Sequence, residues 1–173
     1  MTNPIVVEHH FDSEDELRQW QSSRTTMTQT DNQSAVHCTR ILSSTDNRRA
    51  LSFFSGIDRQ SVVDFLNRHN VPFTHIWHGA PLRPQSPPKP THLVDVILLR
   101  AMPEPITPEM AVASFVENKT CFDIRQTDWH QSYLDTDGIR LVCWFHAPDA
   151  ESVRSAVEAA GSPYVAVWTV ESS

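Results

Sequence analysis

Glycine is scarce in this sequence, with only four residues in 173. Phosphate-binding loops, dinucleotide-binding turns and the Gly-x-Ser-x-Gly nucleophile elbow all need closely spaced glycines, because the backbone there turns sharply or approaches a ligand. None of these motifs occurs in the chain. The sequence therefore predicts no nucleotide cofactor, and no nucleophile constellation stands out.

Clusters of basic residues and long apolar runs are missing as well. The densest basic pair is Arg48 with Arg49, and the net charge is −7. Nucleic acids and anionic membrane surfaces are recognised by clustered Lys and Arg, and a membrane-spanning helix needs about 20 apolar residues. We therefore expect neither nucleic acid nor a membrane as a partner.

Cysteine is represented by Cys38, Cys121 and Cys143. An odd number without metal-binding spacing fits neither a disulfide framework nor a zinc motif. The first residues, Met-Thr-Asn-Pro, also lack the basic start and apolar stretch of a secretory signal. These features predict a cytoplasmic protein with three free thiols.

What the sequence does contain is an internal repeat. Residues of the first half recur with the same identity 91 positions later, without a gap, and five such pairs carry the comparison. The pairs are Phe54 and Phe145, Asp58 and Asp149, Val62 and Val153, Pro72 and Pro163, and Trp77 and Trp168. Matches that include Pro and Trp are hard to obtain by chance, so the chain is predicted to hold two copies of one unit.

Each half reads as strand, helix, strand, strand, helix, strand. The predicted strands cover residues 5–7, 35–42, 50–54 and 73–77, and then 93–99, 129–134, 139–145 and 164–170. Helices are expected to begin at Ser13, where Glu16 completes a capping box, at Thr107, and after Asp58 and Asp149. The fold class is therefore α+β: tandem ferredoxin-like βαββαβ repeats that pack sheet to sheet as a pseudo-dimeric α+β barrel.

The boundaries of the repeats follow from a proline-rich segment. We expect the first repeat at residues 1–78, a linker at 79–92 and the second repeat at 93–173. The linker contains five prolines, which favour an extended and semi-rigid spacer.

The second half also resembles a known family. Its segments Trp129-His-Gln-Ser-Tyr, Cys143-Trp-Phe-His-Ala-Pro-Asp and Ala160-Gly-Ser-Pro-Tyr are similar to those of the nickel-binding-protein-like family, small ferredoxin-like proteins of mostly unassigned function. The resemblance is clear over residues 93–171 and weak over 4–78. It implies a ferredoxin-like unit that pairs through its sheet, together with a transition-metal site.

The family pattern is divided between the two halves. In the family, the first strand tends to end in Glu, and the second strand tends to read aromatic, any residue, His, Ser, Tyr. By this resemblance Glu8 and His37 keep the polar pair in the first half. The second half has Leu99 and Gln131 in these places. We expect His130 on the opposite face from Gln131, and His146 at the solvent end of its strand.

Strand alternation groups the remaining candidates. Glu8 and His10 share one face of the first strand, and His75 and Trp77 share one face of the last strand of that half. We therefore predict a cleft between the repeats with two sets of residues. The metal ligands are Glu8, His10, His37 and His75, and the ligand cavity is lined by Trp77, Gln131 and Trp168. The alternative is that these histidines are ordinary surface or hydrogen-bonded residues.

Three functions fit this pattern, and one of them is a ligand-free protein that binds a partner. The first is a protein that binds a small ligand or a transition metal ion, nickel or zinc, because imidazole and carboxylate suit such ions. The second is a small-molecule enzyme of the isomerase, cyclase or cofactor-independent oxygenase type. The sequence leaves undecided whether the protein forms a homodimer. On either hypothesis, replacing Glu8 or His37 by Ala is expected to abolish function while the melting temperature stays almost unchanged.

Overall fold

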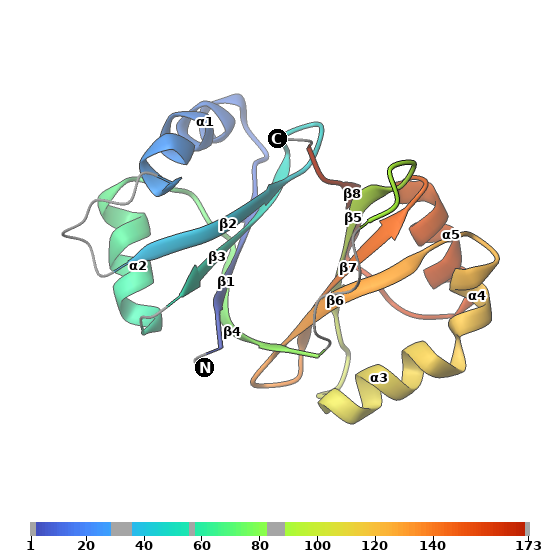
Figure 1. The fold of residues 1–173 in the computed structure, drawn as a ribbon. Coiled ribbons are helices and arrows are strands. Elements are labelled where there is room, and N and C mark those ends of the chain that lie inside the picture. The colour runs from blue at the N-terminus through green and yellow to red at the C-terminus, as the bar shows by residue number, and fades with distance from the viewer. Residues whose placement is uncertain (1–2, 29–35, 56–57, 83–88, 172–173) are drawn as a thin grey trace. The chain divides into compact units, whose positions relative to one another are not determined.

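A computed structural model of the chain describes residues 3–28, 36–55, 58–82 and 89–171. The chain divides into two compact units, with the boundary between Gly79 and Ala80. Each unit is an antiparallel sheet with helices packed on it (Figure 1).

The sheet of the first unit has the strand order β2-β3-β1-β4. Its elements are β1 (Ile5–His10), α1 (Glu14–Thr28), β2 (His37–Ser43), β3 (Arg49–Ser55), α2 (Arg59–Arg68) and β4 (His75–Pro81). Trp20 of α1 and Leu66 of α2 are buried in one cluster with Val7 and Phe54 of the sheet. Both helices therefore cover the same face of this sheet.

The second unit has the equivalent order, β6-β7-β5-β8. Its elements are β5 (Val94–Ala101), α3 (Pro108–Glu117), α4 (Lys119–Asp123), β6 (Asp128–Asp135), β7 (Arg140–Ala147), α5 (Ala150–Ala159) and β8 (Ala166–Thr169). The core joins Leu98 and Phe145 of the sheet to Phe122 of α4 and Val157 of α5. Here too the helices cover one face.

The two units agree residue by residue at the spacing of 91. Ile5 pairs with Phe54 as Val96 pairs with Phe145, and each fourth strand places its tryptophan beside the equivalent residue of the first strand. Both second strands carry a β-bulge, between Cys38 and Arg40 and between Trp129 and Gln131. Left-handed backbone recurs at two pairs of equivalent positions, which are Asn47 and Gly138, and Asn70 and Gly161. The predicted repeat and the α+β class are thus confirmed.

Local signals were accurate at the helix starts. Ser13 and Glu16 form the reciprocal bonds of a capping box, each at 3.2 Å. Asp58, Thr107 and Asp149 each accept a hydrogen bond from the backbone N–H three residues on. These caps fix where α1, α2, α3 and α5 begin.

Two elements differ most clearly from the prediction. The strand expected at 73–77 runs instead from His75 to Pro81, because the Gly79 N–H donates to the Pro4 carbonyl at 2.8 Å and continues the ladder. The short helix α4 was not predicted, since five residues carry too little periodicity. Within the expected linker, residues 83–88 lie outside the described residues, as does the start of the strand expected at Ala35.

Two further observations concern the cysteines and the helices. Cys38, Cys121 and Cys143 are all free thiols, as predicted. In the described ranges, none of the helices is long and apolar enough to cross a membrane.

Candidate functional site

Glu8 lies near the middle of β1, on the face of the first sheet that the helices of this unit leave uncovered. We call this the helix-free face. Glu8 Oε1 accepts a hydrogen bond of 2.8 Å from Trp77 Nε1, and Glu8 Oε2 lies 3.4 Å from His75 Nδ1. The register explains the contact, because Glu8 and His75 are direct cross-strand partners and Trp77 is two residues further along β4.

The three side chains differ in their access to solvent. The Glu8 side chain is 4% exposed, whereas that of His75 is 48% exposed, and Trp77 is buried. A buried carboxylate is costly unless it is paired or hydrogen-bonded. Trp77 supplies one such bond at one oxygen, while the other oxygen is directed to a solvent-accessible imidazole. The group is thus a buried, hydrogen-bonded carboxylate beside a half-exposed imidazole.

The other two predicted metal ligands are placed differently. His10 shares the face of Glu8 and is partly exposed, and its Nε2 lies 3.4 Å from Asp12 Oδ1. His37 is exposed and pairs with Ser55, four residues along β3 from the Glu8 partner Leu51. That offset is about 13 Å along the strands. The structure therefore brings together Glu8 and His75, with His10 on the same strand face, and does not bring His37 to them.

Burial of Glu8 changes the stability expected of its variants. Glu8→Ala is expected to lower the free energy of unfolding by about 1–3 kcal/mol, because the buried Trp77 N–H loses its acceptor. Glu8→Gln keeps an acceptor oxygen and should cost less. Urea denaturation of both variants measures the difference. Equal stability of Glu8→Ala and the wild type, as the sequence alone suggested, would mean that the indole bond contributes nothing.

The second unit contains a related cluster that sequence reasoning missed. Asp95 Oδ1 accepts a 2.9 Å bond from Trp144 Nε1 and lies 3.4 Å from His146 Nε2, and its Oδ2 lies 2.6 Å from Lys89 Nζ. Burial raises the pKa of Asp95, but the bonds from Lys89 and Trp144 outweigh it and hold that pKa below its usual value. The signal in the sequence was a lone Asp in the apolar strand Val-Asp-Val-Ile-Leu-Leu.

Two histidines in this cluster correct the expectations. His146 is buried within β7 rather than at a solvent end, and this burial lowers its pKa although Asp95 acts to raise it. His130 stacks on His146 at 4.5 Å and meets the Trp144 ring edge-on. It therefore shares the face of Gln131, because the bulge at Trp129–Gln131 breaks the simple alternation. The second half has thus not lost its carboxylate–imidazole pair; it carries one at another position.

The residues predicted to line a ligand cavity lie on helix-free faces. In the second unit, Gln131 pairs with Trp144, which pairs with Ile97, which pairs with Trp168, so the four form one row across the sheet. Gln131 Oε1 and Trp168 Nε1 are buried and have no hydrogen-bond partner within the described residues. Trp77 lies in the first unit, where its indole N–H donates a hydrogen bond to Glu8. A ligand cavity formed by these three residues stays a prediction.

Each cluster offers two protein donors for a metal ion. In the part of the chain that the structure describes, no group of three or more His, Cys, Asp or Glu side chains is arranged to hold a metal. Cys38 and Cys143 are weak candidates for further ligands, because burial raises the pKa of Cys143 and raises that of Cys38 to about 11, so both stay protonated near neutrality. Any bound ion would need water, or a rotated His10, to complete its coordination.

Comparison with known proteins supports the family resemblance. Residues 97–170 match the model of the SCO4226-like family, described as nickel responsive protein SCO4226-like. The match covers β5 to β8 almost completely, which is the half where the resemblance was clear. No curated protein matches the chain.

Solved structures match over almost the whole chain. An anthrone oxidase-like protein superposes with a TM-score of 0.53 at 8% identity, covering 99% of this chain and 92% of that one. A chlorite dismutase variant from Candidatus Nitrospira defluvii gives a TM-score of 0.55 at 11% identity, covering 98% and 90%. At such identities the likeness concerns the fold alone.

Proposed function

We propose that the protein binds a transition metal ion at Glu8 and His75 of the first unit, with nickel as the first candidate. The observation that carries this proposal is the 3.4 Å separation of Glu8 Oε2 from His75 Nδ1. Metal–ligand bonds to nitrogen and oxygen are about 2.1 Å long, so one ion can contact both atoms. Imidazole and carboxylate are donors that suit Ni²⁺.

The surroundings of Glu8 favour a bound ion. The Trp77 indole holds one carboxylate oxygen at 2.8 Å and so orients the other; hydrogen bonds of this kind commonly fix metal-binding side chains. His75 is half exposed, which gives an ion a path from solvent. His10 is on the same face, and rotation away from Asp12 would offer a further imidazole. The nickel responsive description of the family that matches the second repeat supports the choice of metal.

The pair in the second unit is the weaker candidate. The ammonium of Lys89 lies 2.6 Å from Asp95 Oδ2, so a cation already neutralises that carboxylate. A metal ion would have to compete with it.

Titration calorimetry with Ni²⁺ tests the proposal on the full chain. His75→Ala and Glu8→Gln are expected to weaken the tightest binding event by about tenfold or more. His92→Ala, which removes an exposed histidine of the second unit, is the matched control and should leave it unchanged. His146→Ala tests the competing pair. Binding that survives in His75→Ala and Glu8→Gln but fails in His146→Ala would move the site to the second unit.

The same proposal includes binding without catalysis and a location in the cytoplasm. No contact in the described residues favours isomerase, cyclase or oxygenase chemistry over binding, so binding is preferred. The three free thiols support the cytoplasm as the location, because a reducing compartment keeps cysteines unpaired.

A further inference from the structure

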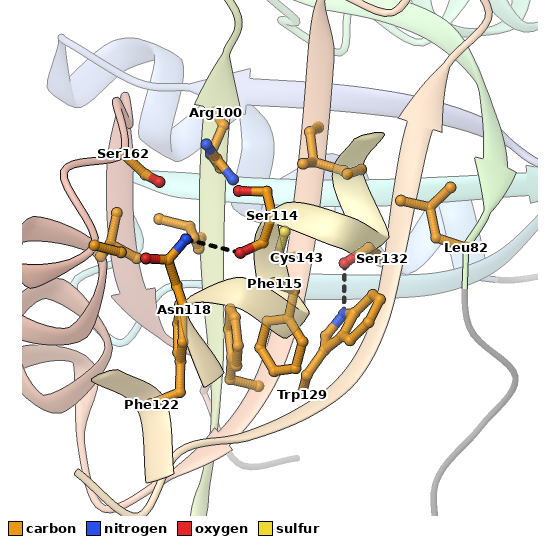
Figure 2. A pocket seen from close by; sticks show the side chains of 16 residues that line it. Leu82, Arg100, Ser114, Phe115, Asn118, Phe122, Trp129, Ser132, Cys143 and Ser162 are labelled. Carbon is orange, nitrogen blue, oxygen red and sulfur yellow. Dashed lines mark hydrogen bonds between the residues drawn. The ribbon is translucent and has the colours of Figure 1, made fainter. Parts of the chain in front are cut away.

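A pocket lies within the second unit, between the helices α3, α4 and α5 and the sheet face that they cover (Figure 2). It has none of the residues predicted for a ligand cavity. One wall is aromatic, and its members are Phe115, Phe122, Trp129 and Phe145. Figure 2 shows Arg100, Ser114 and Ser162 gathered at the other end. The pocket is therefore apolar in its body and polar at one end.

Arg100 is the distinctive residue of this pocket. Its Nε donates to the Pro163 carbonyl at 3.1 Å, which holds the guanidinium in place. Among the described residues no carboxylate pairs with it, so its other N–H donors are available. A guanidinium with available donors at the polar end of the pocket matches a planar carboxylate, to which arginine binds through two parallel hydrogen bonds.

The thiol in the pocket is a lining group rather than a reactive one. Burial raises the pKa of Cys143, and a protonated thiol behaves as a small apolar side chain. Ser132 accepts the Trp129 indole N–H at 2.7 Å, so the indole does not need a ligand for its hydrogen bond. Recognition of a polar group is left to the Arg100 end.

Helix α3 forms one wall of the pocket. The enclosed cavity is about 30 Å³, enough for about two water molecules. Yet α3 buries none of its residues fully, and a second hollow of about 570 Å³ runs between α3 and the segment Pro81–Leu82. Phe115 of α3 packs against Phe122, Trp129 and Phe145, so the ligand proposed below has to displace α3 towards the outer hollow to gain room.

We propose that this pocket binds a small monocarboxylate with an aromatic or similarly compact apolar body. The carboxylate would pair with Arg100 beside the hydroxyls of Ser114 and Ser162, and the apolar body would lie against Phe115 and Trp129. The site shares no residue with the Glu8–His75 pair, so it is independent of metal binding.

Calorimetric titration of the full chain with benzoate tests this site, with benzamide and acetate as comparison ligands. Benzamide keeps the ring but loses the charge, and acetate keeps the charge but loses the ring. Both are expected to bind about tenfold or more weakly than benzoate. No benzoate binding, or equal binding of benzamide, would overturn the proposal without needing any variant.

Variants locate the site. Arg100→Gln is expected to weaken benzoate binding by about 10- to 100-fold, since a charge-assisted pair is lost. Arg59→Gln removes an exposed arginine of α2 in the first unit and is the matched control. Ala111→Leu, which places a larger side chain on the α3 wall, should also reduce binding. Benzoate binding that folded Arg100→Gln and Ala111→Leu both retain would refute the assignment.

Discussion

Replacing Gly138 with alanine is expected to lower the free energy of unfolding by about 3 kcal/mol or more. Gly138 has φ +74, and an added Cβ would lie 2.4 Å from the Ile106 carbonyl oxygen and 2.9 Å from the Ile106 nitrogen. The Ile106 N–H also donates to the Gly138 carbonyl at 3.0 Å. The clash is with backbone, which cannot move aside without breaking this bond.

Gly161→Ala is the matched control. Gly161 also has positive φ, at +65, but a Cβ there would meet nothing within 4 Å. Gly161→Ala should lower the free energy of unfolding by about 1 kcal/mol, the cost of left-handed backbone alone. Urea unfolding of both variants separates the two terms. Equal losses would show that the Asp137–Gly138 turn is not packed against Ile106 as the structure has it.

Acidification is expected to destabilise the first unit through His9. This residue is buried on the helix-covered face, where Nδ1 donates to the Pro72 carbonyl at 2.7 Å, and Nε2 lies 2.9 Å from Ser52 Oγ. The ring centroids of His9 and Trp20 are 4.5 Å apart. Burial lowers the pKa of His9 to about 4, against a raising effect of the Pro72 bond. The folded protein therefore keeps this imidazole neutral.

The sign of the pH effect follows from the two states. Between about pH 6.5, where an unfolded histidine takes up its proton, and about pH 4, only the unfolded chain is protonated at this residue. The stability from neutral His9 is complete above pH 6.5 and decreases as the pH falls through that window. The slope is about 1.4 kcal/mol per pH unit, so about 3 kcal/mol is lost in all.

Unfolding measured at pH 7 and at pH 4.5 checks this effect. His9→Gln can keep both hydrogen bonds without titrating, so it should remove most of the difference between the two pH values. His92→Gln, at an exposed position, should leave the difference as in the wild type. If His9→Gln keeps the full wild-type dependence, another group causes the acid sensitivity.

Most of the fold could be predicted because its signals are local. Asp58 and Asp149 carry their capping chemistry wherever they stand, and Asn70 and Gly161 are residues that accept left-handed backbone. The spacing of 91 then joined the two sets of signals into one repeated unit. The strand order and the pairing register are equivalent in the two units, as expected for a repeat.

The candidate site was predicted less completely, because it depends on contacts between strands. Alternation correctly put Glu8, His75 and Trp77 on related faces. It could not place His37 along its strand, since the distance depends on register. It failed at His130, because a bulge adds a residue that the sequence does not mark. Asp95 was missed because its partners, Trp144 and His146, come from a strand 49 and 51 residues later.

His9 shows the same limit in the core. Strand alternation places it on the same buried face as Val7 and Phe11. Its two hydrogen-bond partners, Pro72 and Ser52, are 63 and 43 residues away. Only the folded arrangement shows that His9 is a neutral core residue with both ring nitrogens in hydrogen bonds.

Anomalous diffraction at the nickel absorption edge, from crystals of the full chain grown with one equivalent of Ni²⁺, would show whether nickel binds at Glu8 and His75. We predict an anomalous peak within bonding distance of both the Glu8 carboxylate and the His75 imidazole in the wild type, and its loss in His75→Ala crystals. A peak at Asp95 and His146, or no ordered nickel at Glu8 while the protein binds the ion in solution, would contradict it.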